Sequence, residues 1–161
     1  MKPGFKQTEV GVIPEDWEVK SIRELGQLSK GKGIRKNEAD SGSIPCIRYG
    51  ELYTHHNDVI RLYNSRISEQ VAKTSRRLNK GDILFAGSGE TKEEIGKCAA
   101  FIGDEIAYAG GDILVLTPNQ GDPRYFGYLF NAPAIARQKA GKGQGDAIVH
   151  ITAPALSSVR V

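Results

Sequence analysis

Short apolar runs, each closed by glycine, proline or a polar turn, alternate with polar segments along most of the chain. Short runs of β-branched and aromatic residues between turn signals are typical of buried strands. One further segment alternates apolar and polar residues, which is the pattern of a half-buried strand. Strands are therefore predicted at 17–20, at the start of 27–36, and at 44–49, 82–86, 97–101, 106–108, 112–117 and 148–151.

The longest helical pattern covers 122–140, where apolar residues recur with helical spacing. Asp122 suits the N-cap of this helix, and Pro123 suits its first position, where a missing N–H is harmless. Pro133 is expected to split or kink the segment, because proline cannot donate the hydrogen bond of a helix interior. Shorter helical turns are predicted at 22–25, 68–73 and 154–156, the second with Ser65 or Ser68 as its N-cap.

The stretch 78–101 predicts a strand, a glycine-rich polar loop and a returning strand. Gly87-Ser88-Gly89 places little side-chain bulk in the way of a close partner. A polar loop held between two buried strands is a common place for recognition or catalysis. We therefore treat this hairpin as the first candidate for a functional site.

These elements are short, and strands outnumber helices. We expect an α+β fold, with a curved and mostly antiparallel β-sheet, short helices and long loops. The 161 residues are enough for one ordinary domain with its own core, so 1–161 is predicted to be a single domain. Hydrophobic and charged fractions of 39% and 25% are those of a globular protein and exclude a disordered one.

Several features indicate a cytoplasmic protein without a membrane span or a metal. No apolar run approaches the roughly 18 residues of a membrane helix, and the N-terminal segment lacks the apolar core of a secretory signal. Cys46 and Cys98 lie in apolar runs and are expected to be reduced core residues. The histidines, His55, His56 and His150, lack further ligands at metal-binding spacing, so no metal site is expected.

The formal net charge is +3 and the isoelectric point is about 8.8, which is only mildly basic. The basic residues are nevertheless clustered. A solvated face explains any one cluster alone, but three clusters beside loop-forming residues favour a surface for a polyanion. The clusters are Lys30, Lys32, Arg35 and Lys36; Lys73, Arg76, Arg77 and Lys80; and Arg137, Lys139 and Lys142.

Catalytic alternatives find little support in the sequence. A DNA amino-methyltransferase needs a cofactor-binding glycine loop that opens a helix and a proline-rich loop for the target amine, and neither occurs. A magnesium-dependent nuclease is the alternative function, with Asp82, Glu90 and Lys92 as its candidate residues. Glu90 and Lys92 fall in a loop where a strand is needed, so we predict no catalytic residue.

A DNA-binding function requires less of these residues. Lysines and arginines beside glycines can contact phosphates, and loop side chains, His150 among them, can reach base edges. The predicted phosphate contacts are Lys30, Lys32, Arg35, Lys36, Lys139 and Lys142. The predicted base readers are Arg48, Ser88, Thr91, Lys92 and Gln144.

The chain resembles the specificity subunits of type I restriction–modification systems. The phrase TEVGVIPEDW at 8–17, followed by Leu25-Gly26, is similar to the opening of that family. IPCIRYGEL at 44–52 and GDILFAGSG at 81–89 resemble two further family motifs, and 148–161 resembles the end of a target recognition domain. The resemblance implies a non-catalytic module that binds double-stranded DNA. Methylation and cleavage would then belong to partner methyltransferase (modification) and restriction subunits, which would bind S-adenosylmethionine and ATP.

Two departures from the family pattern affect these expectations. Residues 90–95 lengthen the hairpin loop beyond the usual form, so the family's base preferences do not transfer. The family's subunit also has two recognition domains, each followed by a long helix, and the two helices pack as an antiparallel coiled coil. The chain ends at Val161, before such a helix, and is expected to be a cloned fragment or a truncated half-subunit. A half-subunit would be expected to self-associate.

Overall fold

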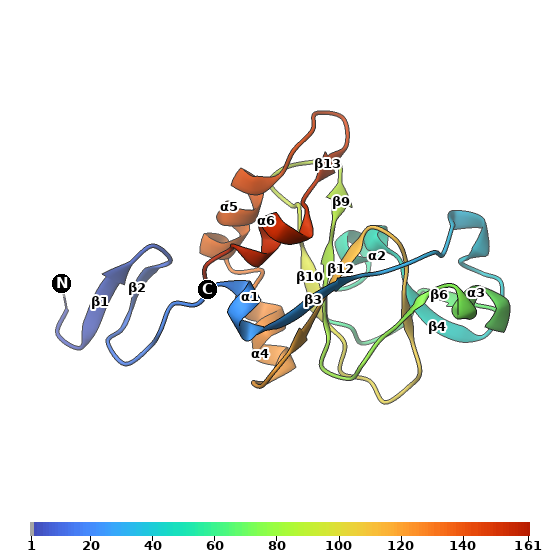
Figure 1. The fold of residues 1–161 in the computed structure, drawn as a ribbon, viewed down its shortest axis with the longest axis horizontal. Helices are drawn as coiled ribbons and strands as arrows, with labels where there is room; N and C mark the ends of the chain where they lie inside the picture. The colour runs from blue at the N-terminus through green and yellow to red at the C-terminus, as the bar shows by residue number, and fades with distance from the viewer. Residues whose placement is uncertain (1) are drawn as a thin grey trace.

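The computed structural model describes residues 2–161 and has the expected α+β architecture, with antiparallel-rich sheets and short helices (Figure 1). Its largest sheet has five strands, and neighbouring strands run antiparallel except for the last pair. In spatial order the strands are β3 (Gly26–Lys30), β12 (Ile113–Pro118), β8 (Ile83–Ala86), β10 (Cys98–Ala100) and β5 (Asp58–Val59).

A second sheet of four strands lies beside the first (Figure 1). Its central pair, β4 and β11, is parallel, and its two outer pairs are antiparallel. The predicted strands at 106–108 and 112–117 thus belong to different sheets, because the chain crosses from one sheet to the other between them. In spatial order the strands are β6 (Ser65–Ile67), β4 (Ile44–Ile47), β11 (Tyr108–Ala109) and β7 (Arg76–Arg77).

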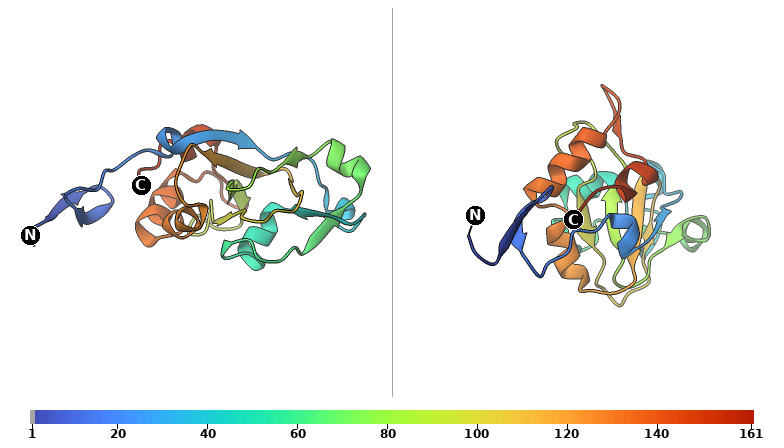
Figure 2. Two further views of the ribbon diagram at one scale, coloured as in Figure 1. Left: turned by 90° about the horizontal axis from the view of Figure 1, so that it is seen from below. Right: turned by 60° about the vertical axis from the view of Figure 1, so that its left-hand side comes forward.

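Two further strand pairs lie outside these sheets. Strands β1 (Phe5–Thr8) and β2 (Gly11–Pro14) form a hairpin that stands away from the body of the molecule (Figure 2). Strands β9 (Ser88–Gly89) and β13 (Val149–His150) pair antiparallel near the loop of the predicted 78–101 hairpin. The outer strands of that hairpin, β8 and β10, pair as the sequence predicts.

The helices are all short, and most were expected. Asp122 and Ser68 each accept a hydrogen bond from the first turn of the helix that follows, and Pro133 begins a new helix. Helix α2 was missed, because its glycine and tyrosines are weak helix formers. The helices are α1 (Ile22–Leu25), the 3₁₀ turn Lys36–Glu38, α2 (Tyr49–Thr54), α3 (Glu69–Lys73), α4 (Pro123–Leu129), α5 (Pro133–Lys142) and α6 (Ala153–Ser157).

Apolar side chains from both sheets share one core. Ile47 and Ala109 of the smaller sheet pack in the same buried cluster as Leu84, Ala99 and Val115 of the larger one. A second cluster covers the opposite face of the larger sheet with α4, α5 and α6, and includes the stacked rings of Phe126 and Phe130. Burial of this kind is the main stabilising contribution to such a fold.

Both cysteines are free and buried, as expected for reduced core residues. The prediction of a half-buried strand at 17–20 was wrong, because these residues form no strand and Trp17 is 52% exposed. This segment links the β1–β2 hairpin to α1, so Trp17 lies against a surface hollow instead of the core. Within the described residues, every helix is too short or too polar to cross a membrane.

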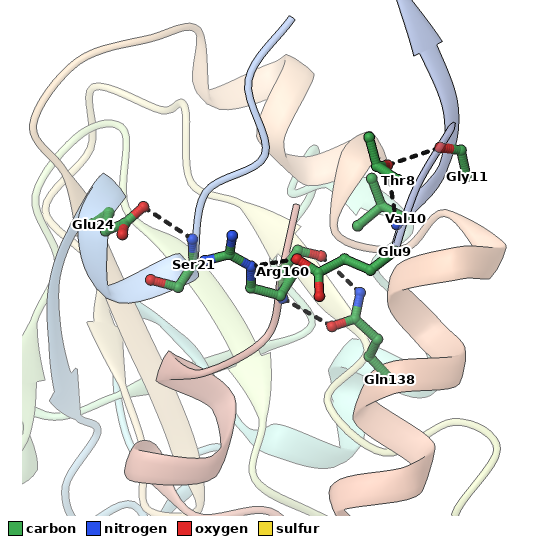
Figure 3. A network of polar contacts seen from close by, with 8 residues as sticks. All are labelled: Thr8, Glu9, Val10, Gly11, Ser21, Glu24, Gln138 and Arg160. Atoms are coloured by element: carbon green, nitrogen blue, oxygen red, sulfur yellow. Dashed lines mark hydrogen bonds and ion pairs between the residues drawn. The ribbon is translucent and has the colours of Figure 1, made fainter. Parts of the chain in front are cut away.

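Polar contacts join the N-terminal hairpin to the last residues of the chain (Figure 3). The carboxylate of Glu9 lies 2.7 Å from Nε of Arg160. The backbone of Arg160 is held in turn by the side-chain amide of Gln138 on α5. Lys20 and Val161 exchange two backbone hydrogen bonds. The C-terminal residues are therefore held against both the turn of this hairpin and the segment that leads into α1.

Candidate nucleic-acid interface

Two of the predicted basic clusters lie next to each other in the folded chain. Arg76 on β7 donates a hydrogen bond to the Ser29 hydroxyl on β3, with a length of 3.0 Å. Gly33, in the loop after β3, lies against the backbone of Thr74, so that a Cβ there would be 3.0 Å from the Thr74 carbonyl. We call the combined region the basic surface, which comprises Lys30, Lys32, Arg35, Lys36, Lys73, Arg76 and Arg77.

The loop that carries the first cluster is held tightly against β11 and β12. Gly31 donates its N–H to the Ile113 carbonyl at 2.7 Å, and Lys32 donates to the Ala109 carbonyl at 3.1 Å. A Cβ on Gly31 would lie 1.9 Å from the Gly110 carbonyl oxygen, so only glycine fits there. Ile34 is buried with a φ of 58°, which anchors the loop to the core. The lysines are thus presented by a well-supported backbone.

The charges of the basic surface are not neutralised by carboxylates. Among residues 2–161 the ion pairs join Lys20 to Glu18, Lys80 to Asp104 and Arg160 to Glu9. None of these involves the basic surface. Glu38, which follows Lys36 closely, uses its carboxylate to accept the backbone N–H of Arg35 at 2.8 Å. The surface can therefore attract an anionic partner with little internal competition.

Arg48 lies beside this loop and is half-buried. Its Nε lies 3.4 Å from the Ile34 carbonyl, at the long end of the range for a hydrogen bond. Arg48 is also the residue that precedes α2, and its backbone N–H donates to the Glu51 carboxylate in the first turn of that helix at 2.8 Å. Arg48 therefore connects the basic surface to the part of the molecule that carries α2.

The β9–β13 pair stands between two hollows. One hollow, of about 440 Å³, is lined by residues that include Lys30, Asp112, His150 and Thr152. The other, of about 550 Å³, is lined by α2 and the 88–95 loop. Glu90 and Glu94 contribute carboxylates to this second hollow, and its lining within residues 2–161 includes no lysine or arginine. Within the same range, the first hollow differs in having a lysine, Lys30, beside its one carboxylate, Asp112.

Comparison with known proteins identifies the family of the chain. Residues 14–161 match the family model described as the type I restriction modification DNA specificity domain. This chain belongs to that family. The resemblance that the sequence motifs indicated is thereby confirmed.

Curated relatives of this specificity domain come from Methanocaldococcus jannaschii. A protein assigned as the specificity subunit of the type I restriction enzyme MjaX is 33% identical over 128 residues, which are 78% of this chain and 30% of the relative. The specificity subunit of type I restriction enzyme MjaIX is 33% identical over 85 residues, 50% of this chain and 20% of the relative. The specificity domain therefore spans less than a third of the length of these relatives.

Solved structures show the same fold. The S subunit of a type I restriction–modification system from M. genitalium has a TM-score of 0.61 at 14% identity, covering 90% of this chain and 33% of that one. The HsdS subunit from Thermoanaerobacter tengcongensis has a TM-score of 0.58 at 14% identity, covering 92% of this chain and 33% of that one. The expected fold class is confirmed.

Ser88 cannot read a base, contrary to the sequence-based prediction. It is 2% exposed, because β9 lies between β13 and the ring of Tyr53. Its carbonyl accepts the Tyr53 hydroxyl at 2.8 Å, and its own hydroxyl lies 2.8 Å from Nδ1 of His150. The side chain that this pair presents to solvent is His150, which is exposed.

Lys139 cannot contact phosphate, which is a second correction. It is 1% exposed, and its Nζ donates to the carbonyls of Gly96 and Phe130 at 2.7 Å each. Burial lowers the pKa of this amine below its usual range. Lys139 follows the buried Ile135 by four residues on α5, and this i, i+4 spacing is the sequence signal that indicated an inward side chain.

The nuclease residues are not assembled. Asp82 is fully buried, and its carboxylate accepts the Asn79 N–H at 2.8 Å and the Thr117 hydroxyl at 2.7 Å. Strand β8 separates Asp82 from the exposed loop that carries Glu90 and Lys92. Within residues 2–161, no group of three or more His, Cys, Asp or Glu side chains could hold a metal ion. Asp82 is therefore a structural residue.

The other predicted contacts are accessible to different degrees and remain predictions. Lys142 and Arg48 are half-buried. The second basic cluster was recognised in the sequence but not assigned to the site, because its proximity to the first depends on long-range packing. The exposed residues are Lys30, Lys32, Arg35, Lys36, Thr91, Lys92 and Gln144.

Proposed function

We propose that this specificity domain recognises a particular sequence in double-stranded DNA and performs no catalysis itself. The observation that supports the proposal best is the basic surface, where two clusters some forty residues apart in the chain lie together without carboxylate partners. Lysines and arginines that neutralise phosphates release counterions, and this release supplies much of the affinity of DNA-binding proteins. Membership of the specificity-domain family supports DNA recognition independently of the basic surface.

The modest net charge of +3 fits a domain that shares its DNA with other subunits. On this proposal, methyltransferase (modification) and restriction subunits carry out methylation and cleavage, and S-adenosylmethionine and ATP bind to those subunits. The complex would act in the cytoplasm. Self-association of the chain is part of the proposal only if the chain is half of a specificity subunit. The relatives are named as specificity subunits of type I enzymes, which supports these roles.

Binding of the 161-residue chain to a labelled random-sequence duplex tests the proposal. Fluorescence anisotropy at several salt concentrations gives the affinity and its salt dependence. The test variant replaces Lys32, Lys36, Lys73 and Arg77 by alanine. If these four side chains each neutralise a phosphate, the slope of log affinity against log salt falls in magnitude by about 3 to 4.

A variant that loses the same charge elsewhere is the matched control. It replaces Lys6, Lys80, Arg124 and Arg137 by alanine, all of which lie outside the basic surface. This control is expected to keep at least most of the wild-type slope. Equal losses in the two variants would mean that binding depends only on total charge. An absence of any duplex binding by the wild-type chain at low salt would contradict the proposed function.

A further inference from the structure

Residues 144–150 form a small hairpin beyond the end of α5. Gln144 donates its backbone N–H to the His150 carbonyl at 2.9 Å, and His150 donates back to the Gln144 carbonyl at 2.8 Å. The intervening turn stands out from the body of the molecule (Figures 1 and 2). Residues 145–148 are exposed, and the apolar side chain of Ile148 is 59% exposed. The tip is thus accessible to a partner.

Strand β9 supports this hairpin on its other side. His150 pairs with Ser88 across the β9–β13 ladder and with Gln144 across the hairpin. Residues directly opposite each other in antiparallel chains place their side chains on the same face. Gln144, His150 and Ser88 therefore form one row across three neighbouring chain segments. Gln144 and His150 are the exposed members of the row.

The buried Ser88 hydroxyl determines which nitrogen of His150 carries the proton. Within the described part of the chain, the only side-chain hydrogen-bond partner of the Ser88 hydroxyl is Nδ1 of His150. A buried hydroxyl proton requires an acceptor, so we assign Ser88 as the donor and Nδ1 as the acceptor. The neutral imidazole then carries its proton on Nε2. His150 therefore offers an N–H donor on the atom that Ser88 does not occupy.

The chemical groups of the row match base edges better than phosphates. The carboxamide of Gln144 offers an NH₂ group that donates and a carbonyl oxygen that accepts, which together complement the N7 and N6 edge of adenine. A single N–H donor suits N7 or O6 of guanine. The only formally charged residue of the hairpin is Asp146, so the hairpin itself is not drawn to phosphates. Lys30, which lines the same hollow as His150, supplies the adjacent positive charge.

We propose that the 144–150 hairpin is the base-reading element of this domain, and that it enters the major groove. Gln144 reads an adenine, and His150 donates from Nε2 to a neighbouring guanine. Ser88 is a positioning residue that acts through His150. The major groove is about 12 Å wide and admits a two-stranded ribbon. This inference rests on the proposed function, and it assigns sequence preference to the hairpin and not to the basic surface.

Selection of bound sites from a random duplex library tests the inference. The wild-type chain is compared with Gln144→Ala, His150→Ala and Ser88→Ala. Gln144→Ala and His150→Ala are each expected to lose about 10-fold in discrimination at one base position. Affinity for non-specific duplex should stay within about 2-fold, because backbone contacts supply it. Ser88→Ala should lose discrimination at the same position as His150→Ala, and the double variant should lose no more.

Two substitutions of the same residue types serve as controls. His55 is an exposed histidine whose Nδ1 lies 2.6 Å from the Thr54 hydroxyl, and Gln120 is an exposed glutamine in the turn before α4. His55→Ala and Gln120→Ala should leave the selected site unchanged. Circular dichroism and the thermal unfolding midpoint show whether each variant is folded. A folded His150→Asn variant provides a second substitution that removes Nε2.

The outcomes separate this inference from the proposed function. If the wild-type chain binds duplex DNA and enriches a site, but the hairpin variants enrich the same site equally well, the hairpin is not the reader. Ser88→Ala with a different effect from His150→Ala would overturn the positioning role. If the wild-type chain binds no duplex at all, the proposed function itself is contradicted and the inference fails with it.

Discussion

Lys139 joins two segments that are far apart in the chain. Its Nζ donates to Gly96, where the 88–96 loop ends, and to Phe130, at the end of α4. It also lies 5.6 Å from the centroid of the Phe85 ring, close enough for a cation–π contact. A charge at this depth is costly unless its donors are satisfied. The lysine therefore stabilises the base of the loop rather than contacting DNA.

Replacement of Lys139 by methionine should lower the free energy of unfolding by about 1–3 kcal/mol, because two buried carbonyls lose a donor while the apolar stem is kept. Chemical denaturation measures this change. Lys142→Met, on the same helix, is the matched control, since Lys142 is only half-buried. An unchanged stability in Lys139→Met would show that the two carbonyls find other donors.

The same variant has a predicted pH dependence. Burial lowers the pKa of Lys139 from its usual value of 10.5, so between its folded-state pKa and 10.5 the unfolded chain binds more protons than the folded one. The contribution of Lys139 to stability therefore rises with pH across that window. The stability difference between wild type and Lys139→Met should widen as pH approaches 10.5. The raised pKa values of the buried cysteines make their contribution to stability fall as pH rises, but this effect is the same in wild type and in Lys139→Met. A constant difference would contradict the lowered pKa.

Helix α4 approaches the larger sheet closely at Gly127. A Cβ at this position would lie 2.0 Å from the Asp58 carbonyl oxygen of β5. The contact is reinforced by Asn131, just after α4, which donates to the Asp58 carboxylate at 2.9 Å and accepts the Cys98 N–H at 2.9 Å. The glycine thus determines how near the helix lies to the sheet.

Gly127→Ala should destabilise the domain by about 2–3 kcal/mol, because the added methyl group meets a backbone oxygen that cannot move aside. Gly141→Ala is the matched control, since Gly141 also lies in a helix and its added Cβ would meet nothing within 4 Å. That control should be stabilised by up to about 1 kcal/mol through helix propensity. Thermal and denaturant unfolding measure both. Equal effects in the two variants would show that α4 can shift away from β5.

The shared core makes the two sheets one unit at the scale of the molecule. Ile47, Ala107 and Ala109 of the smaller sheet region pack with Leu84 and Ala99 of the larger one. Each sheet carries one buried cysteine, Cys46 on β4 and Cys98 on β10. Burial raises the pKa of both thiols from 9.0 to about 12. The thiols therefore report on the opening of the two sheets separately.

Both thiols should resist labelling by a maleimide in native buffer at pH 8 and should become reactive together as denaturant increases. Cys46 packs with Ile34 and Ile67, and Cys98 packs in the cluster between the larger sheet and the helices, so the two lie on either side of the shared core. A domain of this size unfolds cooperatively, so both clusters are expected to open together with that core. Mass spectrometry of proteolytic peptides distinguishes the two sites. The Cys98→Ala variant keeps Cys46 as its single thiol. In this variant Cys46 should become labelled at the same denaturant concentration as in the wild-type chain. Labelling of Cys46 well before Cys98 would show that the smaller sheet opens independently.

The sequence by itself determined those local elements whose signals act over a few residues. Pro133 begins a new helix, and Asp122 and Ser68 cap the helices that follow them. Short apolar runs formed the central strands β8, β10 and β12. The family motifs and the clustering of basic residues were also visible without a structure.

Only the tertiary structure decided which of those residues are exposed to a partner. Charge and residue type do not determine exposure, so Lys139 and Ser88 were taken as contacts although packing buries both. Arg76 lies beside Ser29 because the two sheets pack against each other, and Ser88 lies beside His150 because β9 and β13, which are distant in the chain, pair. Such pairing depends on how buried surfaces fit together over long distances, which no local pattern encodes.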